Sequence, residues 1–306
     1  MTEDLAFMPA TELIQNYRTH KISPVEAVRA SLDRIERYGS KLNAFTIVDP
    51  GSALNAASDS EQRWKTGNPK GLLDGVPTTI KDLVITKGWP TLRGSRSTNP
   101  DQPWDEDAPC VARLKEHGAV LLGKTTTPEF GHKGVTDSML TGITRNPWNL
   151  DKTPGGSSGG ASAAVASGMG QLAIGTDAGG SIRIPACFAG IYGLKPTFGR
   201  VPTYPSSPFG TLAHAGPMTR TVDDAALMLT VIANPDTRDW HALPHDGADY
   251  SSTIDGNIDG LKVALSPTLG LNARIDEEVE EAVANAAQHF SSLGASVERI
   301  DLNWPA

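Results

Sequence analysis

Apolar residues recur at helical spacing near the start of the chain. Residues 23–26, Ser-Pro-Val-Glu, form a capping box with proline at the first helical position. The apolar positions that follow lie on one helical face: Val25, Val28, Leu32 and Ile35. The pattern predicts an amphipathic helix that begins at Pro24, packs on a core and ends before Gly39.

Short apolar runs bounded by turn residues alternate with further helical patterns. Residues 75–85 are typical of a buried strand that carries one lysine, Lys81, near its centre. Other expected strands are 119–122, 171–175, 261–266 and 296–302, and other expected helices are 107–117, 221–232 and 276–293. The last helix has an apolar face made of Val279, Val283, Ala286, Phe290 and Leu293. This alternation predicts an α/β fold with a mixed, mostly parallel central sheet flanked by helices.

Composition narrows the class of protein. With 39% hydrophobic and 20% charged residues, the chain has the make-up of an ordinary soluble globular protein with a sizeable core. A formal net charge of −8 offers no basic footprint for phosphates, so we expect no nucleic-acid partner. The most apolar stretch, near residues 161–174, consists of small residues with too little bulk to span a bilayer, so we expect no membrane partner.

The cysteines and the N-terminus indicate the compartment. Two cysteines, Cys110 and Cys187, cannot form a disulfide framework, which indicates reducing conditions. The acidic N-terminus lacks an apolar core followed by a cleavage site, so we expect a cytoplasmic protein without a signal peptide. No cluster of ligating residues has metal-site spacing and no dinucleotide fingerprint follows a strand, so we expect no cofactor.

Two motif matches point to other enzyme classes. Residues 118–125 match the Walker A phosphate loop, but the four variable positions are Ala-Val-Leu-Leu, which favour a buried strand over an open loop. Residues 155–159 match the G-x-S-x-G nucleophile elbow, but polar turn-formers rather than a strand precede them. An α/β-hydrolase therefore stays a distant alternative.

Two glycine-rich segments contain serines that could carry chemistry. Residues 153–160 run directly into an Ala-rich helical pattern, which favours an ordered loop in close contact with its surroundings over a flexible linker. In residues 175–185, glycines before Ser181 would let successive backbone amides converge beside the serine oxygen and stabilise an oxyanion. On this segment alone, a tight turn with an incidental serine explains the pattern equally well.

Together, these segments resemble the amidase signature family. The resemblance rests on Lys81-Asp82 after a Gly-Val-Pro strand, on the loop 155–160, and on Gly-Thr-Asp-Ala-Gly-Gly-Ser-Ile-Arg-Ile-Pro at 175–185. Further matches are Gly123-Lys124-Thr125 leading to Pro128-Glu129-Phe130, Asn146-Pro147-Trp148, residues 193–197 with Gly199-Arg200, and Gly216-Pro217-Met218. They cover nearly the whole chain in order and explain the Walker A match as family sequence.

The resemblance implies an amidase that cleaves a carboxylic amide C–N bond through an acyl-enzyme. Ser181 would attack the carbonyl, and Ser157, which in this family sits at a cis peptide, would relay the proton to the base Lys81. The backbone amides that would form the oxyanion hole belong to Ala178, Gly179, Gly180 and Ser181. The positions with a supporting role are Ser158, Asp177 and Arg183.

The residues themselves allow this chemistry without requiring it. A serine hydroxyl needs a base near neutral pH, and a lysine can serve where burial disfavours its charged form. Lys81 has apolar neighbours, although a lysine that reaches solvent or pairs with Asp82 is the simpler interpretation on the residues alone. His132 and His214 are other possible bases, but we expect surface or packing roles for them, and a small, buried apolar role for Cys187.

The resemblance also defines the expected domain plan. We expect one amidase domain over residues 1–306, with N-terminal helices at about 10–66 and the signature core at about 70–235. Family members continue beyond the point where this chain ends, so the C-terminal part of the domain is expected to be truncated. A second copy of the chain or another partner would then cover the exposed sheet edge.

Two further functions stay open beside a hydrolase acting on a small-molecule amide. One is the glutaminase subunit of a tRNA-dependent amidotransferase, which shares the Ser–Ser–Lys machinery but works inside an assembly. The other is a truncated paralogue that binds without catalysis, although all three catalytic side chains are present.

Overall fold

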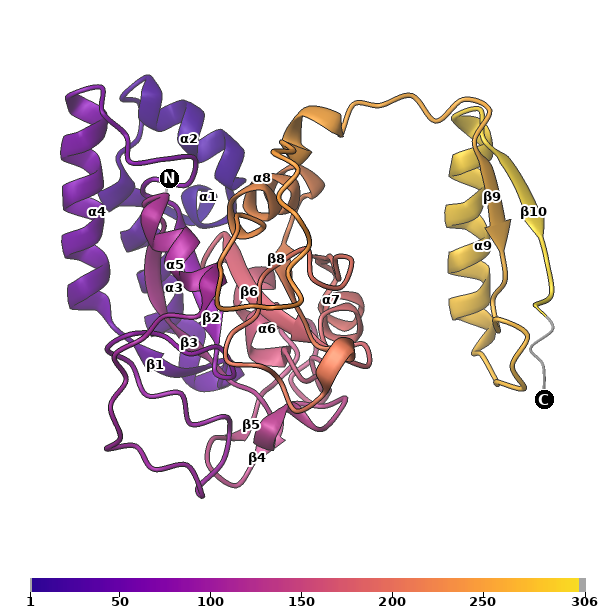
Figure 1. The fold of residues 1–306 in the computed structure, drawn as a ribbon, viewed down its shortest axis with the longest axis horizontal. Coiled ribbons are helices and arrows are strands. Elements are labelled where there is room, and N and C mark those ends of the chain that lie inside the picture. Colours follow the sequence, from indigo (N-terminus) through magenta and orange to yellow (C-terminus); the bar gives the residue numbers. More distant parts are fainter. Residues whose placement is uncertain (1, 303–306) are drawn as a thin grey trace. The chain divides into compact units, whose positions relative to one another are not determined.

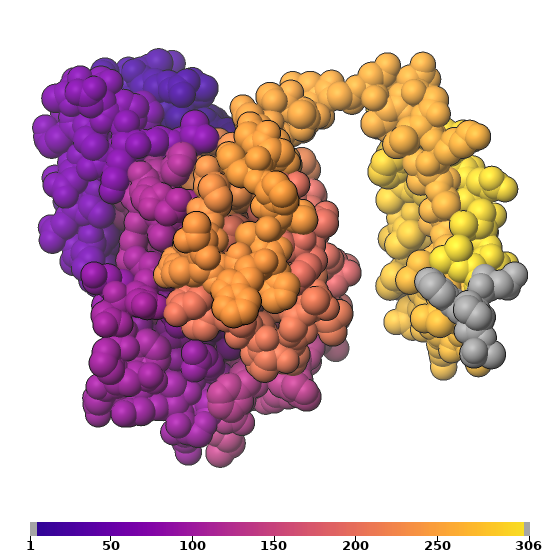
Figure 2. Space-filling model, in the orientation of Figure 1, coloured from indigo at the N-terminus to yellow at the C-terminus, as the bar shows by residue number. Residues whose placement is uncertain are grey.

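The chain folds as two compact units, Met1–Ile254 and Asp255–Ala306, in a computed structural model that describes residues 2–302 (Figure 1). The first unit contains a six-stranded sheet with the strand order β1-β3-β2-β6-β8-β7, and the second contains the strand pair β10-β9. Each unit is a packed body of its own in the space-filling view (Figure 2).

The large sheet is mixed, with a parallel centre. Its strands are β1 (Phe45–Val48), β2 (Pro77–Lys81), β3 (Val120–Thr125), β6 (Leu172–Asp177), β7 (Tyr192–Gly193) and β8 (His214–Thr219). Strand β2 pairs parallel with both β3 and β6, whereas β1, β7 and β8 join by antiparallel pairing. A separate hairpin consists of β4 (Asp137–Ser138) and β5 (Gly142–Ile143). The expected α/β fold with a mixed central sheet is confirmed.

Helices cover both faces of this sheet. They are α1 (Thr2–Phe7), α2 (Ala10–Arg18), α3 (Pro24–Leu42), α4 (Pro50–Lys65), α5 (Pro109–Glu116), α6 (Gly159–Ala166), α7 (Arg183–Ala189) and α8 (Val222–Ile232). Single turns of 3₁₀ helix occur at η1 (Glu129–Gly131), η2 (Gly210–Leu212) and η3 (Tyr250–Thr253). None of the described helices is both long and apolar enough to cross a membrane.

The two faces of the sheet carry separate cores. Leu121 of β3 belongs to a core with α2, α5 and α8, whereas its neighbours Val120 and Leu122 belong to a core with α3, α4 and α6. This division follows from the alternation of side chains along a strand. A smaller cluster joins α6 and α7 to β6 and β8.

Helix α3 confirms the predicted start but not the predicted end. The Ser23 side chain accepts a hydrogen bond from the Glu26 amide, and the Glu26 carboxylate accepts one from the Ser23 amide at 2.8 Å. Gly39 stays helical, and the helix runs on to Leu42, which is buried in the second core. The helix ends because Asn43 adopts the left-handed conformation, with φ of 51°.

The second unit has three elements, β9 (Lys262–Leu265), α9 (Glu277–Ser292) and β10 (Ser296–Arg299). All three were expected from the sequence pattern, and Gly294 follows α9 with φ of 94°. The two strands are parallel, with Val263 opposite Val297. Within this unit most of the predicted apolar face of α9 stays exposed, because the two short strands cover little of it.

Candidate active site

Lys81 ends the central strand β2 and is completely buried. Its Nζ lies 2.7 Å from Ser157 Oγ, 2.8 Å from Ser158 Oγ and 2.8 Å from Thr176 Oγ1. Burial lowers the pKa of Lys81 well below its usual range, and the negative charge of Asp177 only partly opposes this effect. The structure therefore excludes both simpler roles for this lysine, since it neither reaches solvent nor pairs with Asp82.

The hydrogen bonds around Lys81 determine which hydroxyl can give it a proton. Ser158 Oγ donates to the Thr176 carbonyl and accepts from the Thr176 amide, both at 3.2 Å. Its own proton is thus engaged, and Ser158 can only accept from Lys81. Ser157 Oγ has no hydrogen-bond partner other than Lys81 among residues 2–302. Its proton is therefore free to point at the lone pair of a neutral lysine.

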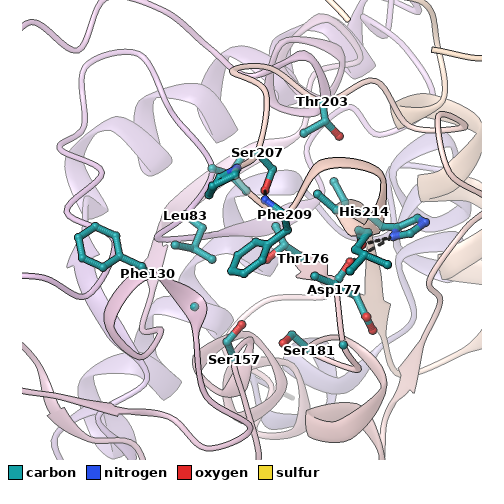
Figure 3. Close-up of a pocket in the computed structure, with 18 of the residues that line it drawn as sticks. Leu83, Phe130, Ser157, Thr176, Asp177, Ser181, Thr203, Ser207, Phe209 and His214 are labelled. Atoms are coloured by element: carbon teal, nitrogen blue, oxygen red, sulfur yellow. Dashed lines mark hydrogen bonds between the residues drawn. The ribbon is translucent and has the colours of Figure 1, made fainter. Parts of the chain in front are cut away.

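Ser157 lies in an ordered loop before α6, as the glycine-rich pattern predicted. The Gly156–Ser157 peptide is cis, and a side chain at Gly156 would meet Val135 O at 2.5 Å. The Ser158 amide donates to the Ser181 carbonyl at 3.2 Å, which ties this loop to the second glycine-rich segment. Ser157 and Ser181 consequently lie beside each other on one wall of a cavity (Figure 3).

This cavity has a volume of about 640 Å³ and exposes the serines unequally. Ser181 is half-buried and lines it, whereas Ser157 is only 1% exposed and Lys81 does not line it. A substrate in the cavity would reach Ser181 first and Lys81 only through Ser157. Side chains that give the wall an apolar character are Leu83, Phe130, Ile184, Phe209 and Leu212.

Asp177 shapes the turn that leads to Ser181. Its carboxylate accepts two hydrogen bonds from the Arg183 guanidinium, at 2.9 and 3.0 Å, and one from the Ile182 amide at 3.0 Å. Burial alone would raise the pKa of Asp177, but the Arg183 guanidinium and the backbone amides outweigh it and hold the pKa below its usual range. Both residues therefore act on the turn that leads to Ser181.

The amides of this turn differ from the expected oxyanion hole at one position. The Gly180 amide donates to Asp177 Oδ1 at 2.7 Å, so it is not free to bind a substrate oxygen. Gly180 also does not line the cavity, whereas Ala178, Gly179 and Ser181 do. The amides of these three residues make no hydrogen bond within the described part of the chain. The resemblance implies four amides, whereas in the structure the Asp177 carboxylate binds the amide of Gly180.

The histidines and cysteines hold positions that their sequence context did not reveal. His132 and His214 both line the cavity, and they also hold the surface and packing positions expected of them, since His132 is exposed and His214 packs against Phe198. His132 stacks on Phe209, and His214 Nε2 lies 3.3 Å from Lys195 Nζ. Cys187 is exposed on α7 rather than buried, and it does not line the cavity.

Two contributors to the site have no signal in the local sequence. Thr176 supplies the third hydroxyl around Lys81, and a second buried lysine, Lys124, pairs with Asp82 at 3.5 Å. Burial lowers the pKa of Lys124 to about 8 and raises that of Asp82. Thr176, Lys124 and Lys81-Asp82 all lie in the family motifs, but the motifs do not show which of these side chains meet. Because a buried lysine requires a hydrogen-bond or charged partner, Lys124 needs Asp82 beside it.

The two competing motifs have the wrong backbone. Residues 120–125 of the Walker A match form strand β3, so no open loop is available to hold phosphates. Residues 149–154, which precede the G-x-S-x-G match, form turns and irregular backbone instead of a strand. In the part of the chain that the structure describes, no group of three or more His, Cys, Asp or Glu side chains could hold a metal ion.

Comparison with known proteins agrees with the geometry. The amidase family model matches residues 26–305, and the chain belongs to this family. Its fold is that of a bacterial aryl acylamidase of the amidase signature enzymes, at a TM-score of 0.91 and 36% identity over 98% of this chain. A peptide amidase structure matches at a TM-score of 0.87 and 31% identity over 96% of the chain.

Two of the curated relatives have different functions. The chain is 40% identical to an acylamidase of Rhodococcus erythropolis over 99% of its length. It is 42% identical to a glutamyl-tRNA(Gln) amidotransferase subunit of Myxococcus xanthus over 96% of its length. The chain spans 64% and 60% of these two relatives, and 62% of the aryl acylamidase structure.

Proposed function

We propose that this chain carries the catalytic machinery of an amidase that hydrolyses a carboxylic amide C–N bond. The observation that carries the proposal is the buried Lys81 amine, with its lowered pKa, 2.7 Å from Ser157 Oγ. A neutral amine in this position is a base that can activate a serine through a second hydroxyl. The acylamidase and peptide amidase relatives support the same reaction class.

In the proposed reaction, Ser181 Oγ attacks the amide carbonyl while its proton passes to Ser157 Oγ and the Ser157 proton passes to Lys81. The negative charge that develops on the carbonyl oxygen is stabilised by the amides of Ala178, Gly179 and Ser181. When the C–N bond breaks, the proton returns from Lys81 through Ser157 to the departing amine. Water then attacks the acyl-enzyme by the same proton path and releases the acid.

A fluorophosphonate probe tests this assignment. We expect intact-mass analysis to show one adduct on the wild-type chain, mapped to Ser181 by peptide sequencing. Ser181→Ala should abolish the adduct and Ser157→Ala should slow its formation, whereas Ser252→Ala, at an exposed serine, should leave it unchanged. Labelling that persists in Ser181→Ala and disappears in Ser157→Ala would reverse the roles of the two serines.

A second candidate is the glutaminase role within an amidotransferase, favoured by the 42% identity to the Myxococcus xanthus protein. This function would use the same serines and lysine on glutamine inside an assembly. Ammonia release from glutamine that depends on added partner subunits would support it. Hydrolysis of simple amides by the chain alone supports the first candidate.

We infer a cytoplasmic protein whose substrate is a small molecule. The two cysteines, Cys110 and Cys187, cannot form a disulfide framework, which supports a reducing compartment. A second copy of the chain or another partner at an edge of the large sheet, at β1 or β7, is part of the same proposal. Light scattering of the purified chain at several concentrations tests self-association.

A further inference from the structure

Among the residues that the structure describes, one charged residue in the wall of the cavity has no counter-charge. Asp177 is neutralised by Arg183 at 2.9 Å, and Lys133 by Asp137 at 2.8 Å. Arg93 also lines the cavity and is half-buried, yet its side chain makes no hydrogen bond or ion pair within residues 2–302. A guanidinium removed in part from water gains most from a planar anion such as a carboxylate.

The backbone around Arg93 is held by buried polar groups. Arg93 adopts the left-handed conformation, with φ of 57°, which is uncommon for a residue with a side chain. The amides on either side of it, of Leu92 and Gly94, donate to the Asp82 carboxylate at 3.2 and 3.3 Å. Asp82 is in turn paired with the buried Lys124. A residue in such a strained conformation persists only where the surrounding structure holds it in place. Residues of this kind cluster at functional sites.

The backbone around Arg93 also lies close to Ser157, one of the proposed reacting serines. The Phe130 amide donates to the Arg93 carbonyl at 2.8 Å, and the next residue, Gly131, packs against Ser157. A Cβ placed on Gly131 would lie 3.3 Å from Ser157 Oγ. The acidic neighbour Glu129 is engaged elsewhere, because its carboxylate accepts from Ser95 Oγ at 2.6 Å. The hydrogen bond between Phe130 and Arg93 therefore connects the backbone of Arg93 to the segment that lies next to Ser157.

We propose that Arg93 determines substrate specificity, and that the preferred amide carries a carboxylate on an otherwise apolar or aromatic body. The apolar side chains of Phe130, Ile184 and Phe209 would contact the body, and the Arg93 guanidinium would bind the carboxylate. This inference rests on the proposed amidase function and names its substrate class. It adds an ionic contact to a cavity that is otherwise suited to neutral aryl or alkyl groups.

Two pairs of matched amides test the proposal. 4-Carbamoylbenzoate and 4-nitrobenzamide differ in charge on the acyl side, and 4-acetamidobenzoate and 4′-nitroacetanilide differ in charge on the amine side. For the anionic member of at least one pair, we expect Arg93→Gln to lower kcat/KM by about ten- to a hundredfold, mainly through KM. The neutral member should change less than about twofold, and Arg93→Lys should retain part of the preference.

The control variant is Arg96→Gln, which removes an exposed arginine of the same segment that does not line the cavity. It should leave both pairs unchanged. An equal loss on anionic and neutral substrates in Arg93→Gln would overturn the specificity role. A wild-type chain without preference for either anionic amide would overturn it as well.

A binding measurement separates this inference from the proposed function. In a Ser181→Ala background, which cannot turn over, calorimetry should show binding of 4-carbamoylbenzoate or of 4-acetamidobenzoate that Arg93→Gln weakens by at least about tenfold and that salt weakens. Binding of the matched neutral amide, 4-nitrobenzamide or 4′-nitroacetanilide, should not respond to the substitution. If Ser181 is not labelled and no amide is hydrolysed, the proposed function fails, while the binding comparison still decides the role of Arg93.

Discussion

Lys81 Nζ lies 2.7 Å from Ser157 Oγ, and Lys81 is 0% exposed and Ser157 1% exposed. Water therefore does not separate the amine from the hydroxyl, and Ser157 stands between Lys81 and the cavity. The contact orders the three proposed catalytic residues by depth, from the half-buried Ser181 inward.

Lys81→Met should lower activity without lowering stability. Methionine has a similar volume but no amine, so the proposed base disappears and kcat should fall by about 10²- to 10⁴-fold. The thermal unfolding temperature should not fall, because burying an amine disfavours folding. Steady-state amide hydrolysis and calorimetry check both parts, with the exposed Lys65→Met as a control. Activity within tenfold of wild type would remove Lys81 from the mechanism.

The lowered pKa of Lys81 predicts the pH dependence of activity. The base works only when neutral, so kcat/KM should fall as the pH drops through the folded-state pKa of Lys81. Because burial places that pKa well below 10.5, the rate should reach its plateau well below pH 10.5. A pH–rate profile measures this, and a rate that keeps rising up to pH 10.5 would show a solvated lysine.

Stability should depend on pH through the same group. Between the folded-state pKa of Lys81 and the unfolded value near 10.5, the unfolded chain binds a proton that the folded chain does not. The free energy of unfolding should therefore rise with pH in this window, by at most about 1.4 kcal/mol per pH unit. Lys81→Met should lack this contribution, so the difference between urea-unfolding free energies of the two proteins should change with pH across the window, and a constant difference would contradict the lowered pKa.

Arg183→Gln should loosen the turn before Ser181. It removes both guanidinium hydrogen bonds to Asp177 and leaves the carboxylate to the backbone amides alone. We expect kcat to fall about ten- to a hundredfold with a smaller change in KM, because the amides of the proposed oxyanion hole lose their fixed position. Arg299→Gln breaks an exposed ion pair in the other unit and serves as the control. Equal kinetics for the two variants would contradict the role of Arg183.

Gly131→Ala should disturb Ser157 directly. An added Cβ would lie 2.6 Å from Leu83 Cδ1 and 3.3 Å from Ser157 Oγ, at a φ of 70°. Gly88→Ala is the matched control, since Gly88 has a φ of 85° and nothing within 4 Å of the added atom. Both should lose about 1 kcal/mol of stability through backbone strain, whereas only Gly131→Ala should also lose activity. Urea unfolding and amide hydrolysis measure the two effects.

Elements with local determinants were predictable from the sequence. The capping box at Ser23 marks the start of α3, and Thr221 caps α8 by accepting from the Asp224 amide at 3.2 Å. Gly39 failed as a stop signal because a glycine inside a helix is tolerated where the next turn is buried, here through Leu42. The positive φ of Asn43 could not be read from an apolar pattern.

Contacts between distant segments were not predictable in the same way. Thr176 meets Lys81 across 95 residues, and Asp82 meets Lys124 because β2 and β3 are neighbours in the sheet. The family resemblance named Lys81, Ser157 and Ser181, and the fold brings Lys81 against Ser157 and Ser157 beside Ser181. The direction of the Gly180 amide depends on how the Asp177 carboxylate folds back over its own turn, which spacing alone does not reveal.

The position of Lys81 beneath Ser157 also limits what can substitute for it. Small amines added to a solution can restore some enzymes that have lost a lysine, provided that they diffuse into the vacated space. Here the way in from the cavity is occupied by the Ser157 side chain, and three hydroxyls surround the position of the amine. Chemical rescue of a Lys81→Ala enzyme by methylamine should therefore fail. The residual activity of this variant should also not depend on the choice of buffer.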